Sequence, residues 1–293
     1  MWSVWTTATG EPGARLPHRM KTPPGQRDTP VRAIPVAQGE HDRRFLVFAG
    51  IVLVAVALGF KSELLTANQV WVLGLGLIVI AAPAILAYLR SADEPPAIEH
   101  YIPVALGAIT LAGLAVLVPE LWKFAVLTAM FGVGFVLAGR LDYLRLRNSE
   151  KRGHLVLQEA ILICVLAGAY LVVVTLPFNT ILRLLWVIVI TFLASYRSFR
   201  INGSSIVPSR AFIFAVFVAQ VVTFLAWAVI ALESYLYLNE GIFAGILLIA
   251  WYINRGLVRH TVEDSFTRHV VLEYSAFAAV LVYLFVSSYQ PGR

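Results

Sequence analysis

The sequence contains few charged residues for its length. Aspartate, glutamate, lysine and arginine make up 14% of its 293 residues, whereas hydrophobic residues make up 59%. Soluble domains carry roughly 25% charged and roughly 45–50% apolar residues. A water-soluble core of this size has too little volume to hide so much apolar surface. We therefore expect the chain to fold in lipid.

Cysteine and the common catalytic motifs are also scarce or absent. Cys164 is the only cysteine and lies within an apolar run, which excludes an intrachain disulfide and any metal site built from several cysteines. The sequence contains no phosphate-binding, dinucleotide-binding, serine-hydrolase or kinase motif. We therefore expect no cofactor, no metal and no catalytic residue. Whether the protein is an enzyme stays open, with the balance against it.

Nine apolar runs follow residue 44, separated by short polar segments. A transmembrane helix needs about 17–25 such residues, and helices are expected because backbone groups in lipid must pair within their own segment. The runs cover residues 45–60, 69–89, 101–118, 123–139, 155–176, 181–197, 211–233, 241–254 and 270–288. The sequence therefore predicts an all-α, polytopic transmembrane bundle of about nine spans.

The basic residues orient these runs. When the amino terminus is placed in the cytoplasm and the chain alternates, only Lys61, Lys123, Arg183 and Arg293 of the 23 basic residues fall outside. This distribution follows the positive-inside rule. It predicts a cytoplasmic amino terminus, an external carboxyl terminus and a multi-pass protein of the cytoplasmic (inner) membrane. It also explains the net charge of +6 without a nucleic-acid partner.

The first 44 residues differ from the rest in composition. Residues 1–44 hold many prolines and basic residues and no apolar run long enough to cross a bilayer. This composition is typical of a disordered segment. We predict a disordered, basic, proline-rich cytoplasmic tail over residues 1–44 and a transmembrane helical domain over residues 45–293.

Two spans have similar ends, which raises the hypothesis of an internal duplication. "ILAYLRS" (85–91) ends the second span and "FLASYRS" (192–198) ends the sixth. Parallel four-helix repeats would then cover 45–147 and 153–259, with a final span at 270–288. The alternative is that the positive-inside rule alone places arginine at each of these ends.

Two glutamates lie inside predicted spans. Glu159 is four residues beyond Leu155 and Glu273 is three beyond Val270, so each lies roughly 5–6 Å into the apolar layer. An ionisable residue in a span is by default a functional-site hypothesis. One interpretation is a proton or cation site in a cytoplasmic vestibule. The other is structural anchoring through an arginine, for which the candidates are Arg152, Arg197, Arg210, Arg255 and Arg268.

Histidines and one more glutamate complete this candidate vestibule. They are His154, His260, Glu263 and His269, all on the predicted cytoplasmic side. The i,i+4 pair of Arg259 and Glu263 indicates an amphipathic surface helix or an extension of the eighth span. The spacing of His260 to Glu263 and of His269 to Glu273 would place each pair on one helix face. Because no paired ExxH or HExxH pattern is present, we predict no metal site.

The predicted bilayer midplane contains almost no strongly polar residue. Gln220, in the seventh run, is the exception, and we expect it to make an interhelical hydrogen bond worth on average about 0.6 kcal/mol. The GxxxG sequence at 241–245 predicts close helix packing there. A midplane without charge disfavours an ion-coupled pump and leaves room for an apolar substrate.

The segment "GLVRHTVEDSFTRHVVLEY" (256–274) resembles the carboxy-terminal end of a group of uncharacterised bacterial polytopic inner-membrane proteins. The resemblance covers the last third of the chain and implies no activity. Three functions therefore stand as hypotheses. The first is a structural or assembly subunit of a membrane complex, with a membrane-protein partner or a homo-oligomer in the bilayer. The second is a transporter or flippase for an apolar or lipid-like substrate. The third is a membrane-embedded enzyme that acts at the cytoplasmic interface on a lipid-linked substrate.

Overall fold

The computed structural model describes residues 36–62, 70–90, 97–146, 152–202, 206–232 and 238–288. Regular structure in these ranges is helical, and nine of the helices are long and apolar enough to cross a membrane. They are α1 (Val36–Ser62), α2 (Val70–Leu89), α3 (Ile102–Leu117), α4 (Leu121–Leu146), α5 (Arg152–Thr175), α6 (Thr180–Asn202), α7 (Pro208–Ala231), α8 (Glu240–Val262) and α9 (Arg268–Ser288). The prediction of an all-α fold is confirmed for the described residues, and nine of their helices have the length and apolar composition that membrane spans need.

Most helices extend beyond the runs predicted for them, and α1, α4 and α8 do so the furthest. α1 already begins at Val36, directly after Pro35 and inside the segment predicted as a disordered tail; proline disfavours helix in the residue before it and so marks a start. The rest of that tail lies outside the described residues. α4 continues to Leu146 and α8 to Val262. A helix need not end where its apolar run ends. Hydropathy therefore predicts the presence of a span more accurately than it predicts the residue at which the helix ends.

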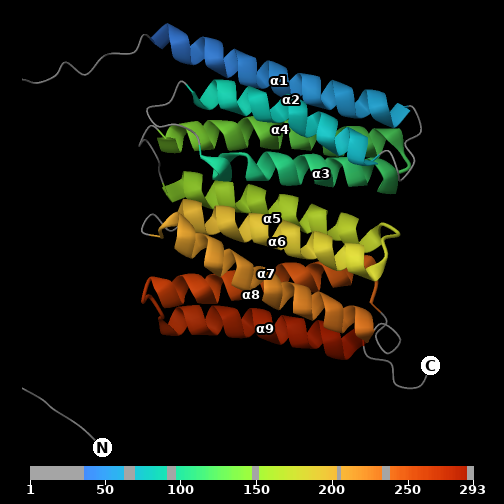
Figure 1. The fold of residues 1–293 in the computed structure, drawn as a ribbon, viewed down its shortest axis with the longest axis vertical. Coiled ribbons are helices and arrows are strands. Elements are labelled where there is room, and N and C mark those ends of the chain that lie inside the picture. The colour runs from blue at the N-terminus through green and yellow to red at the C-terminus, as the bar shows by residue number, and fades with distance from the viewer. Residues whose placement is uncertain are drawn as a thin grey trace, which may run out of the picture. The chain divides into compact units, whose positions relative to one another are not determined.

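The described helices form two hydrophobic cores within the unit Ala37–Arg293. One core joins α1, α2, α4 and most of α3, and the other joins α5 to α9. α3 lies between them and contributes to both, because Leu106 packs in the second core while Ala108 and Leu111 pack in the first. Figure 1 shows α3 between α4 and α5. The two cores divide the chain near the boundary of the hypothetical repeats, but the duplication stays a prediction.

Small residues bring several helices close together. α1 meets α4 where a Cβ on Gly132 would lie 2.7 Å from Val54, and α3 meets α5 where a Cβ on Gly113 would lie 2.1 Å from Val172. The GxxxG sequence in α8 behaves differently. No atom of another residue in the described chain lies within 4 Å of a Cβ placed on Gly245. The predicted close packing is therefore wrong for the two glycines, because neither meets another helix of the described residues, whereas Phe243 and Ala244 between them are buried.

The alternation of the helices gathers arginine at one end of the bundle. The carboxyl ends of α2, α4, α6 and α8 and the amino ends of α3, α5, α7 and α9 lie together there, which we call the basic end. Among the described residues it holds Arg43, Arg44, Arg90, Arg140, Arg145, Arg152, Arg197, Arg200, Arg210, Arg255, Arg259 and Arg268. The opposite end holds Lys61, Lys123 and Arg183. Basic residues are therefore distributed unequally between the two ends.

Candidate functional site

An apolar cleft separates α4 from α5, with α3 as its floor. Its volume is 680 Å³, within the range of about 300–1,000 Å³ that is usual for ligand pockets. Met130, Gly134 and Ala138 line it from α4, and Leu157 and Cys164 line it from α5. Cys164 is exposed. The α4 and α5 helices contact each other much less than α2 contacts α3 or α6 contacts α7, so the two walls are held apart along most of their length.

The walls of the cleft are joined at the basic end by a buried carboxylate. Asp142 lies one turn beyond Ala138 on α4 and is fully buried. The amide of Gln158, next to Leu157 on α5, donates to Asp142 Oδ1 over 3.1 Å. His100, one turn before Pro103 of the cleft floor, places Nδ1 3.2 Å from Asp142 Oδ2. Three elements therefore meet at this single carboxylate.

The positive charge that balances Asp142 comes from α6. Arg197 is 2% exposed, and its Nη2 donates to both oxygens of Asp142, over 3.0 and 3.3 Å. Its Nη1 donates to the backbone carbonyl of Glu99. The Glu99 carboxylate, also buried, accepts from Arg200 Nη2 over 3.1 Å. We call this set, comprising Glu99, His100, Asp142, Gln158, Arg197 and Arg200, the Asp142 network.

The Asp142 network is stable only as a whole. Moving a carboxylate or a guanidinium out of water costs several kcal/mol per ion, and the attraction between them offsets this cost only where the geometry is good and further hydrogen bonds are made. Asp142 meets that condition with Arg197 and Gln158. Removing either charge would leave the other buried without a partner. We therefore expect this network to fix the positions of α4, α5 and α6 at the basic end.

Several polar atoms beside this network are buried without a hydrogen-bond partner in the described chain. They are Arg145 Nη1, Gln158 Oε1, Ser198 Oγ and Arg200 Nε. Such atoms are uncommon in native proteins because each costs about 1–3 kcal/mol. Two of the four belong to cations, and once Arg145 is counted, which donates to the backbone carbonyl of Arg200, this corner holds three guanidinium groups and two carboxylates. This corner of the bundle therefore has unused capacity to bind an anion.

The predicted pair Glu159 and Glu273 lies in a second polar group, next to the first. Glu159 forms an ion pair with Arg255, which is one of the five partners predicted. Glu273 is exposed and accepts a hydrogen bond of 2.6 Å from the hydroxyl of Tyr252. Arg255 is buried and lies 5.3 Å above the ring of Trp251. We call Glu159, Tyr252, Arg255 and Glu273 the Arg255 cluster.

The two polar groups meet at consecutive residues of α5. Gln158 bonds to Asp142, whereas Glu159 pairs with Arg255 of α8. Trp251, beneath Arg255, donates from Nε1 to Ser195 Oγ over 3.0 Å, and Ser195 lies two residues before Arg197. The first turns of α5 therefore connect both groups.

The remaining predicted vestibule residues are spread around the end of α8. Glu263 forms its i,i+4 pair with Arg259 over 3.0 Å, so the segment is an extension of the eighth span up to Val262. His260 Nδ1 lies 2.8 Å from Ser265 Oγ, and its ring lies 5.9 Å from that of Tyr274. His269 is exposed on α9, and His154 is half-buried on α5. No group of three His, Cys, Asp or Glu side chains in the described ranges is arranged to hold a metal ion.

The polar residue of the midplane, Gln220, faces outward. It is exposed on α7, between the buried residues Val218, Ala219 and Val222. No hydrogen bond from its side chain to another described residue is present. The expected bond to a neighbouring helix of the same chain is therefore absent from the part that the structure describes.

Sequence reasoning missed the centre of the site, which is Asp142 with Arg197, His100 and Glu99. The predicted fourth span ended at residue 139, which assigned Asp142 to a loop. A signal was present, because Leu141, Leu144 and Leu146 continue an apolar pattern past that end. Asp142 is also the only acidic residue between Arg140 and Arg147. These features indicate a helix that carries a buried carboxylate.

Comparison with known proteins gives no relative. No family model, no curated protein and no solved structure matches this chain.

Proposed function

We propose that this integral membrane protein binds a lipid or lipid-like molecule in the cleft between α4 and α5 and moves it between the two leaflets, as a transporter or flippase. One observation carries the proposal, namely that an apolar cleft of 680 Å³ leads to the buried Asp142 network. A lipid matches this arrangement, because its acyl chain is apolar like the cleft and its head group is polar like the network. The cleft lining offers no polar site for an ion, which agrees with the uncharged midplane.

The Asp142 network supports a role in movement as well as in binding. Its contact between Gln158 and Asp142 joins α5 to α4 just beyond the cleft residues Leu157 and Ala138. If that contact opens, the unpartnered Nη1 of Arg145 and Nε of Arg200 become available to a phosphate group. Guanidinium groups bind phosphate strongly because two parallel N–H groups match its oxygens. The head group of the substrate is therefore expected to be anionic.

We also propose that the basic end faces the cytoplasm of a bacterial cell, in the inner membrane. The unequal distribution of arginine between the two ends supports this orientation. A cysteine introduced at Arg147, in a Cys164→Ser background, should react with a membrane-permeant maleimide and not with an impermeant one in intact cells. Labelling by the impermeant reagent would show the opposite orientation or a different number of spans.

The proposed function is tested by filling the cleft. Gly134 lines it, and a Cβ there meets no atom within 4 Å. Gly134→Leu should therefore occupy the cleft without distorting the bundle. In liposomes with a fluorescent phospholipid, its transfer between leaflets should be slower than that of the wild type by about tenfold or more, because displacing one buried apolar group weakens binding by about 1.5–3 kcal/mol.

Gly76→Leu is the matched control. Gly76 is half-buried on α2, has the same open space around its Cβ and does not line the cleft. It should transfer lipid at the wild-type rate. Equal rates for Gly134→Leu and Gly76→Leu, with both proteins folded, would remove the cleft from the mechanism.

A structural or assembly subunit is the second candidate, and the exposure of α9 favours it. Only Tyr274 and Ser288 are buried on that helix, and Gln220 is exposed on α7. A polar side chain facing lipid is costly, so a partner helix would relieve it. Purification in a mild detergent should then yield a stoichiometric membrane-protein partner or a homo-oligomer. If the purified protein is a monomer and transfers lipid in liposomes, the subunit proposal is contradicted and the lipid-transfer proposal stands.

A further inference from the structure

A second cavity opens at the end of the bundle opposite the basic end. Its volume is 200 Å³, and the ends of α5 and α7 and the starts of α6 and α8 surround it. Thr175, Arg183, Ile230, Glu240 and Phe243 are among the residues that line it. It shares no residue with the cleft. The two sites can therefore be tested separately.

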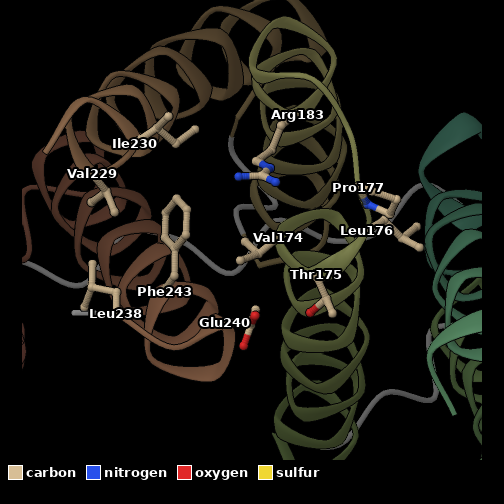
Figure 2. Close-up of a pocket in the computed structure, with 10 residues that line it drawn as sticks. All are labelled: Val174, Thr175, Leu176, Pro177, Arg183, Val229, Ile230, Leu238, Glu240 and Phe243. Atoms are coloured by element: carbon tan, nitrogen blue, oxygen red, sulfur yellow. The ribbon is translucent and has the colours of Figure 1, made fainter. Parts of the chain in front are cut away.

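Arg183 and Glu240 place opposite charges on this pocket without pairing. Figure 2 shows the guanidinium of Arg183 and the carboxylate of Glu240 on opposite sides of the space, with Val174 between them and Phe243 to one side. Neither residue forms an ion pair with any other residue of the described ranges, and Arg183 Nε is buried without a hydrogen-bond partner there. Arg183 is half-buried whereas Glu240 is exposed, so the cost of an ionised group that is partly removed from water without a partner applies to Arg183.

Lys123, which lies at the start of α4 at the same end of the bundle, already has an acidic partner. Lys123 Nζ lies 2.7 Å from Glu120 Oε1. This hydrogen bond lowers the pKa of the Glu120 carboxyl below its usual value. Lys123 is therefore a natural control for Arg183, because both are cations at the same end and Lys123 does not line this cavity.

The arrangement of the walls defines which ligand fits. α5 ends at Thr175 and α7 at Ala231, and the last carbonyls of a helix have no partner within it and carry partial negative charge. The starts of α6 and α8 bring partial positive charge to the same pocket, so the full negative charge of Glu240 is what favours a cation on its side. Arg183 favours an anion on the other. The ring of Phe243 forms an apolar wall beside these two regions.

We propose that this pocket binds a small zwitterionic group, with its anionic end at Arg183 and its ammonium end toward Glu240. Phosphoethanolamine has this chemistry, both as a free solute and as the head group of a phospholipid. The volume of 200 Å³ suits such a small group and excludes a large ligand. The inference stands independently of lipid transfer through the cleft.

Binding to the full-length protein in detergent tests the site. Phosphoethanolamine should bind the wild type, and inorganic phosphate or ethanolamine alone should bind at least about tenfold more weakly, which corresponds to about 1.4 kcal/mol. Arg183→Gln and Glu240→Gln should each weaken phosphoethanolamine binding by about tenfold or more. Lys123→Gln should leave it unchanged. Far-ultraviolet circular dichroism and thermal unfolding check that each variant is folded.

Nanodiscs separate the two sources of the ligand. The wild type and Glu240→Gln are each placed in nanodiscs of phosphatidylethanolamine and in nanodiscs of phosphatidylglycerol, and their thermal unfolding midpoints are measured. Glu240→Gln is used here so that the test does not depend on the folding of Arg183→Gln. Stabilisation by phosphatidylethanolamine alone, lost in Glu240→Gln, supports the site with a lipid head group as its ligand. Binding of free phosphoethanolamine without that lipid effect supports it with a solute. The proposal is overturned if neither probe binds, or if neither variant weakens binding.

Discussion

The two polar groups at the basic end contain the same kinds of residue but differ in burial. In the Asp142 network, Asp142 and Arg197 are 0% and 2% exposed and lie on different helices. In the Arg255 cluster, Arg255 is 5% exposed, its partner Glu159 is 25% exposed, and Glu273 is exposed. The difference shows that the position of a carboxylate within an apolar run is a poor guide to its burial. The carboxylate placed in a loop by hydropathy is the more deeply buried one.

The largest effect is expected from removing the buried negative charge. Asp142→Asn keeps the size of the side chain but leaves Arg197 buried and uncompensated, so it should lower the free energy of unfolding by about 3–5 kcal/mol. Reversible unfolding in mixed micelles, followed by circular dichroism, measures the change. A loss below about 1 kcal/mol would show that Arg197 finds another partner and that burial does not distinguish the two groups.

Removing both charges should be less harmful than removing one. The Asp142→Leu, Arg197→Met double variant replaces the ion pair with apolar side chains, which in other buried pairs is neutral or stabilising by about 1–4 kcal/mol. Its free energy of unfolding should therefore exceed that of either single variant. If the loss of unfolding free energy in the double variant equals the sum of the losses in the two single variants, the two side chains do not interact.

A smaller effect is expected where α9 packs on α8, beside the Arg255 cluster. A Cβ on Gly256 would lie 2.0 Å from the hydroxyl oxygen and 2.4 Å from the Cζ of Tyr274. Gly256→Ala should therefore force Tyr274 to move, at a cost of about 1–3 kcal/mol. Gly245→Ala, on the same helix with open space around it, should instead stabilise by about 0.5–1 kcal/mol, because alanine favours helix over glycine. The same sign for both variants would contradict this packing.

The smallest effect is expected at the exposed glutamate. Glu273→Gln removes a charge from an exposed side chain that still accepts a hydrogen bond from Tyr252. The free energy of unfolding should change by less than about 1 kcal/mol, since exposed ionic interactions contribute little. A loss as large as that of Asp142→Asn would mean that Glu273 is buried in the membrane, for example against a partner helix.

The nine spans could be predicted because their signals are local in sequence. Apolar runs and alternating arginines are visible within each segment and its flanks. The contact of Asp142 with Arg197 could not be predicted, because it joins residues 55 positions apart on different helices. Nothing in the hydropathy of α6 distinguishes Arg197 from Arg200. Only the packing of α4 against α5 and α6 makes one arginine internal.

The glycines show the same limit. The two glycines of the recognisable motif at 241–245 make no close helix contact, whereas Gly113 and Gly256, which belong to no motif, do. Whether a glycine meets a neighbour depends on which face of its helix is covered. That face depends on the whole bundle, as it does for the outward direction of Gln220.

The most direct test of lipid binding in the cleft is the position of photo-crosslinks. A phospholipid with a diazirine in its acyl chain is reconstituted with the wild-type protein, irradiated, and its adducts are mapped by mass spectrometry. The account predicts strong labelling of cleft residues such as Met130, Leu157 and Cys164, saturating as the lipid is diluted with unlabelled lipid. It also predicts weaker, non-saturating labelling of the exposed residues Phe224 and Trp227 on α7. Equal labelling of both sets, rising linearly with the fraction of probe, would show that the cleft contains only bulk lipid.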